Sequence, residues 1–388
     1  MGKSYDAIVI GAGSVGLPIA YFLGLEDWRV LVIDKEHSQG QGQNKAAIGG
    51  VRATHSDPAK ISLCLQSLEI FSNWEREHGK EIGWKTGGYC YPVYREEDEK
   101  TLKYLLPIQK KYKLNISWIT PEEVLELIPG INPEGLRGGT YAPGDGQVNP
   151  LQSAASFWDE SRKLGVEFIF DQRVTDLIVE GGRIKGVETA DTKFHSDVVV
   201  NAAGARAREI GLMADVDIPV YPDSHEAGIT SAVQPFFEPL IVDVRPGPYG
   251  KTENFYFGQN DLGQVIFCYT PLESVPGENR SSTSEFMPII SKRLIDLIPR
   301  LRNILVRRVW RGLYPMTPDG IIILDRVKEV DGFYLAVGMC GQGFMLGPGV
   351  GINMASLITS GEPVIEKKVF ETLSLYRDFE SSRAESLK

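Results

Sequence analysis

The stretch DAIVIGAGSVG near the amino terminus constrains the fold of this 388-residue chain more than any other feature. The apolar run Tyr5–Ile10 predicts a buried strand, Ser14–Gly24 a helix, and Val30–Asp34 a second strand, so the chain opens with a βαβ unit. The turn after the first strand consists of Gly11, Ala12, Gly13, Ser14, Val15 and Gly16. Its glycines permit a tight turn, close approach of a pyrophosphate and close packing of the helix on the strand. Asp34 ends the second strand, where a carboxylate accepts hydrogen bonds from ribose hydroxyls, so the sequence predicts a dinucleotide site.

Segments of the same α/β character recur in the middle and at the end of the chain. Asn149–Leu164 predicts a helix, Asp197–Asn201 a buried strand, and Phe333–Val337 a strand that leads into a helix through about Thr359. Asp57–Glu77 predicts a long amphipathic helix, Thr120 with Glu123 the capping box of a short helix, and Gly181-Gly182 the turn of a hairpin. Residues 218–270 read as several strands separated by Pro/Gly turns. We therefore expect an α/β fold with a discontinuous Rossmann-like domain and an inserted β-rich domain. The expected Rossmann-like parts are 1–85, 146–217 and 318–388, and the expected parts of the inserted domain are 86–145 and 218–317.

Composition excludes several function classes. The chain has 41 Lys and Arg against 51 Asp and Glu, a net charge of −10, and no basic cluster mixed with aromatics, which argues against nucleic acid as a partner. No apolar run approaches 18 residues and the start lacks the features of a signal peptide, so we expect no membrane span and a cytoplasmic location. The four cysteines and five histidines form no CxxC or HExxH pattern, which predicts free thiols and no metal site.

The segment after Asp34 distinguishes between two cofactors. An NAD dehydrogenase would continue in regular βαβ units, whereas this chain continues with HSQGQGQNKAAIGGVRATHSD, which is polar and rich in glycine. Such a loop can wrap an extended cofactor, which favours FAD; a flexible surface loop is the alternative. The absence of a Ser/His/Asp or paired-carboxylate set weighs against a hydrolase.

Six motifs, in order along the chain, resemble one family over nearly the full length: DAIVIGAGSVG, IGGVR, SLEIF, VVNAAGA at 199–205, WRGLYPMTPDG at 310–320, and GQGFMLGPGVG at 341–351. The family is the D-amino-acid-oxidase type of FAD-dependent oxidoreductases. Within it, the chain is most similar to the branch of sarcosine oxidase β-subunits, glycine oxidase and dye-linked L-proline dehydrogenase β-subunits. The resemblance implies a Rossmann-like FAD domain with a β-rich substrate domain.

The resemblance also implies which residues hold FAD. The residues at the family's ribose and diphosphate positions are Lys35, Gln43, Asn44 and Lys45. Val174 lies in the strand that pairs with adenine, and Ala203 and Gly204 end the strand under the cofactor. The backbone amides that approach the flavin's pyrimidine edge belong to Gly341, Gln342, Gly343 and Phe344. Amides at a helix amino terminus stabilise the negative charge that gathers on a reduced flavin. We expect non-covalent FAD, because the sarcosine oxidase β-subunits' attachment histidine is missing from VNPLQS, and we expect Cys340 to be an ordinary small residue.

Four residues are candidates for the substrate side. By resemblance, Arg52 falls where related amine oxidases hold the substrate carboxylate, which suits its bidentate fork; a structural salt bridge is the alternative. By resemblance, Tyr256 matches a position where a tyrosine lines the substrate face; the alternative is a core aromatic residue in a sheet. Tyr314 replaces an arginine of glycine oxidase, and Arg311 replaces a small residue, so Arg311 adds or relocates positive charge. His225 is a further candidate to face the flavin or the substrate.

The reaction implied is oxidation of the C–N bond of a small secondary amino acid such as proline or sarcosine. A hydride goes to flavin N5, and water hydrolyses the imine. Two alternatives stay open: a flavin enzyme for glycine, D-amino acids or 2-hydroxy acids, and a flavin-bearing electron-relay subunit. A dehydrogenase that passes electrons to a partner subunit is favoured over an oxidase, because the oxygen-promoting lysine of monomeric sarcosine oxidase aligns with the apolar Val265.

Overall fold

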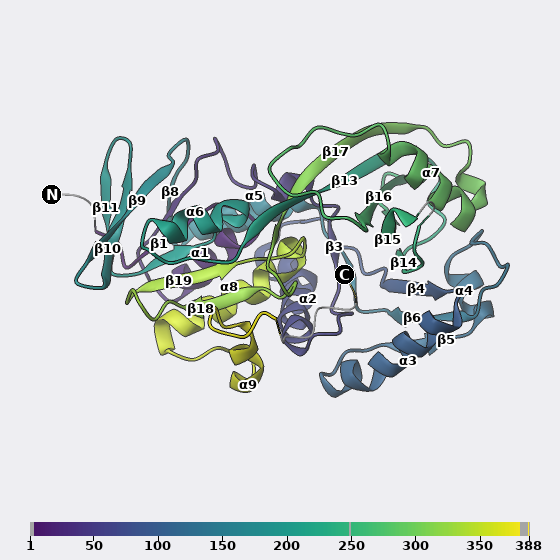
Figure 1. Ribbon diagram of the computed structural model, residues 1–388, viewed down its shortest axis with the longest axis horizontal. Helices are drawn as coiled ribbons and strands as arrows, with labels where there is room; N and C mark the ends of the chain where they lie inside the picture. Colours follow the sequence, from purple (N-terminus) through teal and green to yellow (C-terminus); the bar gives the residue numbers. More distant parts are fainter. Residues whose placement is uncertain (1–3, 248–249, 381–386, 388) are drawn as a thin grey trace.

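The computed structural model describes residues 4–247, 250–380 and 387, and Figure 1 shows two β-sheets side by side with helices around them. The first sheet has six strands in the order β18 (Ile323–Arg326), β19 (Phe333–Val337), β12 (Val199–Asn201), β1 (Ala7–Ile10), β2 (Val30–Ile33) and β8 (Glu167–Ile169). Its pairs are parallel except β18 with β19. Every residue of β1, β2, β12 and β19 is buried, as expected for a parallel sheet covered on both faces.

Helices pack around this first sheet. They are α1 (Gly16–Leu25), α2 (Pro58–His78), α5 (Pro150–Lys163), α6 (Ala207–Leu212), α8 (Gly343–Ser360) and α9 (Lys367–Phe370). The predicted long helix is confirmed as α2, with Asp57 accepting a hydrogen bond from the Lys60 amide (2.9 Å) and Gly79 ending it at φ 64°. The predicted Gly181-Gly182 hairpin is also confirmed. It belongs to a three-stranded sheet of β9 (Val174–Glu180), β10 (Arg183–Thr189) and β11 (Lys193–His195).

The glycine-rich stretch at the start of α8 brings three helices close together. A Cβ on Gly347 would lie 1.9 Å from the Ser14 carbonyl oxygen, and one on Gly349 would lie 2.1 Å from the Leu63 carbonyl oxygen. These two glycines therefore let α8 pack directly against the backbone at the start of α1 and against α2. Packing within the protein therefore accounts for Gly347 and Gly349, which the sequence analysis assigned to no role.

The second sheet has eight strands. Their order is β17 (Val306–Met316), β13 (Tyr221–Ala232), β16 (Gln264–Pro271), β15 (Thr252–Gln259), β14 (Leu240–Asp243), β4 (Tyr89–Val93), β6 (Gly138–Ala142) and β5 (Ser117–Ile119). Three helices accompany it: α3 (Glu96–Lys111), α4 (Pro121–Leu127) and α7 (Phe286–Leu297). The predicted capping box at Thr120 is confirmed. Figure 1 shows β13 and β17 running from beside the first sheet into the second, so this pair joins the two halves of the molecule.

Short elements connect the two sheets. They are η1 (Asn44–Ala46), η2 (Gly204–Arg206) and the two-stranded pair β3 (Gly50–Val51) and β7 (Gly146–Gln147). In the described ranges, no helix has the length and apolar character needed to span a bilayer. The same ranges hold no cluster of three or more side chains suited to a metal ion, and the four cysteines are free thiols. We propose that the boundaries expected from the sequence divide the chain into these two sheet-centred domains.

Candidate functional site

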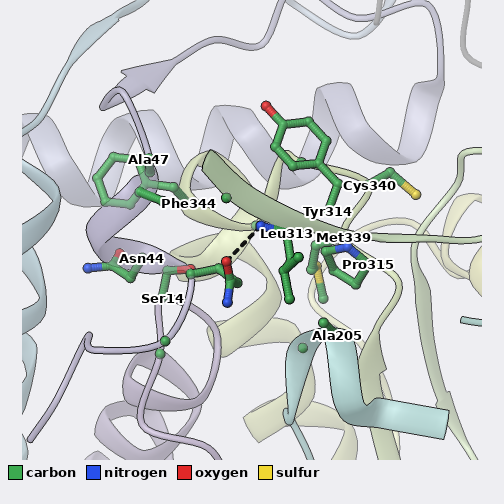
Figure 2. Close-up of a pocket in the computed structure, with 18 of the residues that line it drawn as sticks. Ser14, Asn44, Ala47, Ala205, Leu313, Tyr314, Pro315, Met339, Cys340 and Phe344 are labelled. Carbon is green, nitrogen blue, oxygen red and sulfur yellow. Dashed lines mark hydrogen bonds between the residues drawn. The ribbon is translucent and has the colours of Figure 1, made fainter. Parts of the chain in front are cut away.

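A cavity of about 570 Å³ lies where the two sheets meet, within the usual range for ligand sites. Segments far apart in the sequence form its wall: the first glycine turn, the end of β2, the loop through η1 and β3, the end of β12, and parts of β13, β15, β16 and β17 with the start of α8. Figure 2 shows Ser14 and Asn44 on one side of this cavity and Tyr314 and Cys340 on the other. The cavity therefore joins the predicted dinucleotide site to the predicted substrate side.

The first glycine turn has the geometry that the motif predicts. Gly11 has φ 111°, and a Cβ there would lie 2.6 Å from the Ala202 carbonyl oxygen. A Cβ on Gly16 would lie 1.9 Å from the Gly11 carbonyl oxygen, so Gly16 permits the close packing of α1 on β1 without lining the cavity itself. Gly11, Gly13, Ser14 and Val15 all line the cavity, where they leave room for a phosphate near the helix start.

Asp34 lies on the cavity wall at the end of β2. Its carboxylate accepts hydrogen bonds from the amides of Ala12 (2.6 Å) and Glu36 (2.9 Å). Burial raises the pKa of Asp34, and these two hydrogen bonds oppose the rise. Because a carboxylate has about four lone-pair positions, Asp34 can order the turn and still accept from a ribose.

The loop through η1 lies between the first sheet and β17. Gln43 Oε1 accepts a hydrogen bond from the Leu313 amide (2.7 Å), which is the dashed contact to Leu313 in Figure 2. Asn44 donates from Nδ2 to the Pro150 carbonyl (2.8 Å). Lys35, Gln43 and Asn44 line the cavity, as expected from the resemblance. Lys45 is a correction: it lies outside the wall, and its exposed Nζ points to Gln41 Oε1 at 3.5 Å.

The remaining predicted cofactor residues also lie on the wall: Val174, Ala203, Gly204, Gly341, Gln342, Gly343 and Phe344. Two buried acceptors on this wall, Asn44 Oδ1 and Gln342 Oε1, have no hydrogen-bond partner within the described part of the chain. Unsatisfied buried polar atoms are costly, so a polar ligand between them would remove a penalty. The wall therefore fits an extended dinucleotide such as FAD. Position 341 also needs a glycine for packing within the protein, because a Cβ there would lie 2.1 Å from the Tyr314 ring.

Aromatic side chains form the wall on the side of the second sheet. The hydroxyl of Tyr256 lies 2.9 Å from that of Tyr314 and donates to Cys268 Sγ at 3.0 Å. Burial raises the pKa of both tyrosines well above the usual range, so both hydroxyls are neutral. The ring of His225 lies against that of Tyr314, with centroids 3.9 Å apart. The structure thus brings Tyr256 and His225 together on the cavity wall, and their contact with a substrate stays a prediction.

Arg52 is buried (5 % exposed) and lines the cavity. Its Nη1 donates to the Thr54 carbonyl and lies 3.2 Å from His55 Nδ1, while Nη2 donates to the Leu387 carbonyl (2.7 Å). Asp145 lies nearby: burial raises its pKa to about 6, and the Arg52 charge opposes the rise. Arg52 therefore holds the surrounding loop and also presents positive charge at the cavity.

Two substrate-side expectations are wrong about position. Arg311 does not line the cavity, because it lies on the opposite face of β17 from Gly312 and pairs with the buried Glu226 at 3.4 Å. Val265 also points away from the cavity, into the core of the second domain. From β16, the residues that line the cavity are Cys268, Thr270 and Pro271. Alternation of side chains along a strand explains both errors.

Sequence reasoning also missed residues that line the cavity. Lys60 lies in the first turn of α2 with none of its surface exposed, and Tyr89 reaches the cavity from β4. The available signal for Lys60 was its place on the apolar stripe that includes Cys64 and Phe71. A lysine on such a stripe is unusual, because lysine is rarely fully buried.

A chain of ion pairs at the cavity wall was missed as well. Arg206 pairs with Glu209 (2.9 Å) and with Glu278 of the second domain (2.8 Å), and Arg173 pairs with Glu209. All four residues line the cavity. We call this set of ion pairs the Arg206 clasp. It ties the strand that begins with Val174 to the loop that follows β16.

The sequence and fold match known flavoenzymes. The family described as "DAO: FAD dependent oxidoreductase" matches residues 6–357. L-Proline dehydrogenase from P. horikoshii superposes with a TM-score of 0.91 and 30% identity, covering 99% of this chain and 100% of that one. Glycine oxidase from Geobacillus kaustophilus is 26% identical over 95% of this chain and 97% of its own length. Sarcosine oxidase subunit beta from Rhodobacter capsulatus, named as part of a complex, is 22% identical over 92% and 86%. This chain belongs to the DAO family of FAD-dependent oxidoreductases.

Proposed function

We propose that this enzyme oxidises the C–N bond of a small secondary amino acid of the proline or sarcosine type. The observation that carries the proposal is the buried Arg52 on a cavity wall that is otherwise mainly aromatic and apolar on the substrate side. An amino acid presents one carboxylate next to an apolar carbon skeleton, which is complementary to such a wall. The 30% identity with P. horikoshii L-proline dehydrogenase over nearly the whole chain supports the secondary amine.

In this proposal, each residue orients the substrate. Arg52 binds the carboxylate through its guanidinium, while the neutral hydroxyls of Tyr256 and Tyr314 offer polar contacts without adding charge. His225 supports the Tyr314 ring through a tilted ring contact. FAD held non-covalently by the first glycine turn, Asp34 and the start of α8 would supply the two-electron oxidation of the substrate carbon, and water would hydrolyse the imine product. Removal of the amine from water inside the cavity favours its neutral form over its cation.

We further propose that the enzyme is a dehydrogenase that passes electrons to a partner subunit or a dye. The likeness to L-proline dehydrogenase and to sarcosine oxidase subunit beta supports this. Mixing the reduced enzyme with air-saturated buffer in a stopped-flow instrument is the test. We expect slow reoxidation, and fast reoxidation with stoichiometric hydrogen peroxide would contradict the proposal.

The substrate class is tested by anaerobic titration of the yellow holoenzyme. We expect L-proline or sarcosine to bleach the flavin absorbance at concentrations where glycine, D-alanine and 2-hydroxy acids do not. Bleaching only by glycine or a D-amino acid would move the enzyme to the glycine oxidase type. If the single chain turned over with none of these compounds and an artificial dye, an electron-relay role would be the better interpretation.

A further inference from the structure

One tyrosine of the second sheet places an unused hydroxyl group on the cavity wall. Tyr89 of β4 lines the cavity, and only 5 % of its surface is exposed. Its hydroxyl has no hydrogen-bond partner within the residues that the structure describes. The other two tyrosines of this wall differ, because the hydroxyls of Tyr256 and Tyr314 lie 2.9 Å apart and bond to each other. Tyr89 therefore keeps a donor for another molecule.

The Tyr89 hydroxyl lies beside Arg52. A Cβ on Gly50 would lie 1.9 Å from the Tyr89 hydroxyl oxygen, so the tip of the phenol takes the place of a side chain at position 50. Side chains two residues apart on an extended strand point to the same face, and Arg52 follows Gly50 by two residues at the end of β3. Gly50, Arg52 and Tyr89 all line the cavity. The guanidinium and the hydroxyl therefore face the same part of it.

This part of the cavity belongs to the substrate side. The strand β4 pairs with β14, which pairs in turn with β15, and Val242 of β14 and Tyr256 of β15 are opposite each other on the cavity wall. The ring of Tyr256 packs against the same apolar cluster that contains Tyr89. Tyr89 and Arg52 therefore form the end of the wall that Tyr256 and Tyr314 continue.

Packing does not account for the hydroxyl. The Tyr89 ring packs with Val93, Leu102 and Leu240, and a phenylalanine ring would make the same contacts. A buried polar group without a hydrogen bond lowers stability, so phenylalanine would be the better residue for folding alone. Burial raises the pKa of Tyr89 well above its usual range, and the charge of Arg52 opposes the rise. The hydroxyl is therefore neutral and can donate its proton to an anion.

We propose that the Tyr89 hydroxyl donates a hydrogen bond to the carboxylate that Arg52 binds, and that it selects amino acids over amines without a carboxylate. The inference rests on the proposed function and deepens it by naming a second donor to the substrate. A carboxylate has about four lone-pair positions and can accept from both residues. An amine without a carboxylate would leave the Tyr89 donor unpaired in the complex, which weakens its binding.

The test is the binding of pyrrole-2-carboxylate to the holoenzyme, measured by titration calorimetry. This planar ring carries a carboxylate but has no α-hydrogen to lose, so binding is separated from turnover. We expect Tyr89→Phe to raise its dissociation constant about 10- to 100-fold, the range for a hydrogen bond to a charged group. Pyrrole, which lacks the carboxylate, should bind no more weakly to Tyr89→Phe than to wild type.

Tyr141→Phe is the matched control. Tyr141 lies on the neighbouring strand β6, outside the cavity wall, and its hydroxyl donates to the Gly87 carbonyl at 3.3 Å. We expect Tyr141→Phe to lower the unfolding temperature and leave the dissociation constant unchanged. Tyr89→Phe should not lower the unfolding temperature, because it removes no hydrogen bond within the described part of the protein.

Two results would overturn the inference: dissociation constants within threefold in wild type and Tyr89→Phe, or no binding of pyrrole-2-carboxylate to wild type. Equal weakening of pyrrole and pyrrole-2-carboxylate would also overturn it, because the hydroxyl would then only shape the cavity. The proposed substrate class fails separately. If the carboxylate shows the expected dependence on Tyr89 but neither L-proline nor sarcosine bleaches the flavin, the role of Tyr89 is supported and the substrate is a different carboxylate.

Discussion

Replacing Arg52 with alanine is the most direct test of the substrate side. The side chain is buried and positively charged, and truncating one partner of a buried charge pair costs about 2–5 kcal/mol. At about 1.4 kcal/mol for each factor of ten, the apparent affinity for the amino acid should fall by roughly 30-fold to several thousand-fold. FAD content should be retained, because the first glycine turn, Asp34 and the start of α8, which carry most of the predicted cofactor contacts, lie in other segments of the wall.

The same substitution has a structural cost that must be separated from the binding effect. Arg52→Ala removes hydrogen bonds to the Thr54 and Leu387 carbonyls, and hydrogen bonds from a charged donor contribute about 1.5–3 kcal/mol each. Steady-state titration with a dye acceptor should therefore be run well below the unfolding temperature of the variant.

Two arginine variants serve as controls for this measurement. Arg308→Ala, at an exposed position of β17, should change neither stability nor affinity. Arg311→Ala should lower stability by about 3–5 kcal/mol because it leaves Glu226 buried without this partner, but the affinity should stay the same. An unchanged affinity in Arg52→Ala would refute the role of Arg52 in binding. Loss of flavin would instead reassign Arg52 to the cofactor.

Three further predictions concern the cofactor and stability. Arg206→Gln removes two exposed ion pairs of the Arg206 clasp, and each pair contributes about 0.3–1 kcal/mol. FAD should therefore dissociate about 3- to 30-fold faster in a dilution assay. An unchanged dissociation rate would show that the Arg206 clasp does not retain FAD. Gly347→Ala places a Cβ 1.9 Å from the Ser14 carbonyl oxygen and should lower the unfolding free energy by about 1–3 kcal/mol. Gly144→Ala should be nearly neutral, because no other heavy atom lies within 4 Å of the Cβ it adds. Equal effects of the two substitutions would contradict the packing argument. Because burial raises the pKa of Asp145 to about 6, its protonation favours folding at low pH, and this stability is lost as the pH rises through 6. The stability advantage of Asp145→Asn over wild type should therefore grow by about 2 kcal/mol between pH 4 and 7; a constant difference in urea titrations would exclude this.

Local signals account for most of the fold that was predicted from the sequence. The helix α2 was predicted because its apolar stripe lies within one continuous segment. The first βαβ unit was predicted for the same reason, since the glycine turn and Asp34 are close in sequence and their spacing follows from the motif. These features depend on neighbouring residues and do not require knowledge of which strands pair.

Errors arose where the answer depended on pairing between distant segments. Arg311 and Tyr314 are three residues apart on one strand, and only the pairing of β17 with β13 shows which side chain faces the cavity. The Arg206 clasp unites residues from three separate segments, none of which carries a recognisable motif. Lys60 is different, because its place on an apolar stripe was visible in the sequence and only its significance was missed.

Because α8 packs against α1, the amount of folded protein in a cell depends on the supply of its cofactor. The cavity is lined by residues from Ile10 to Met345, so a nascent chain cannot complete it until Met345 has been synthesised. FAD must then bind to a finished but empty protein, whose stability it raises by about 2.7 kcal/mol at a hundred times its dissociation constant. A cell short of FAD would accumulate the less stable empty form, which is the form that proteases remove. The amount of this enzyme would then follow the availability of FAD without any change in its gene expression.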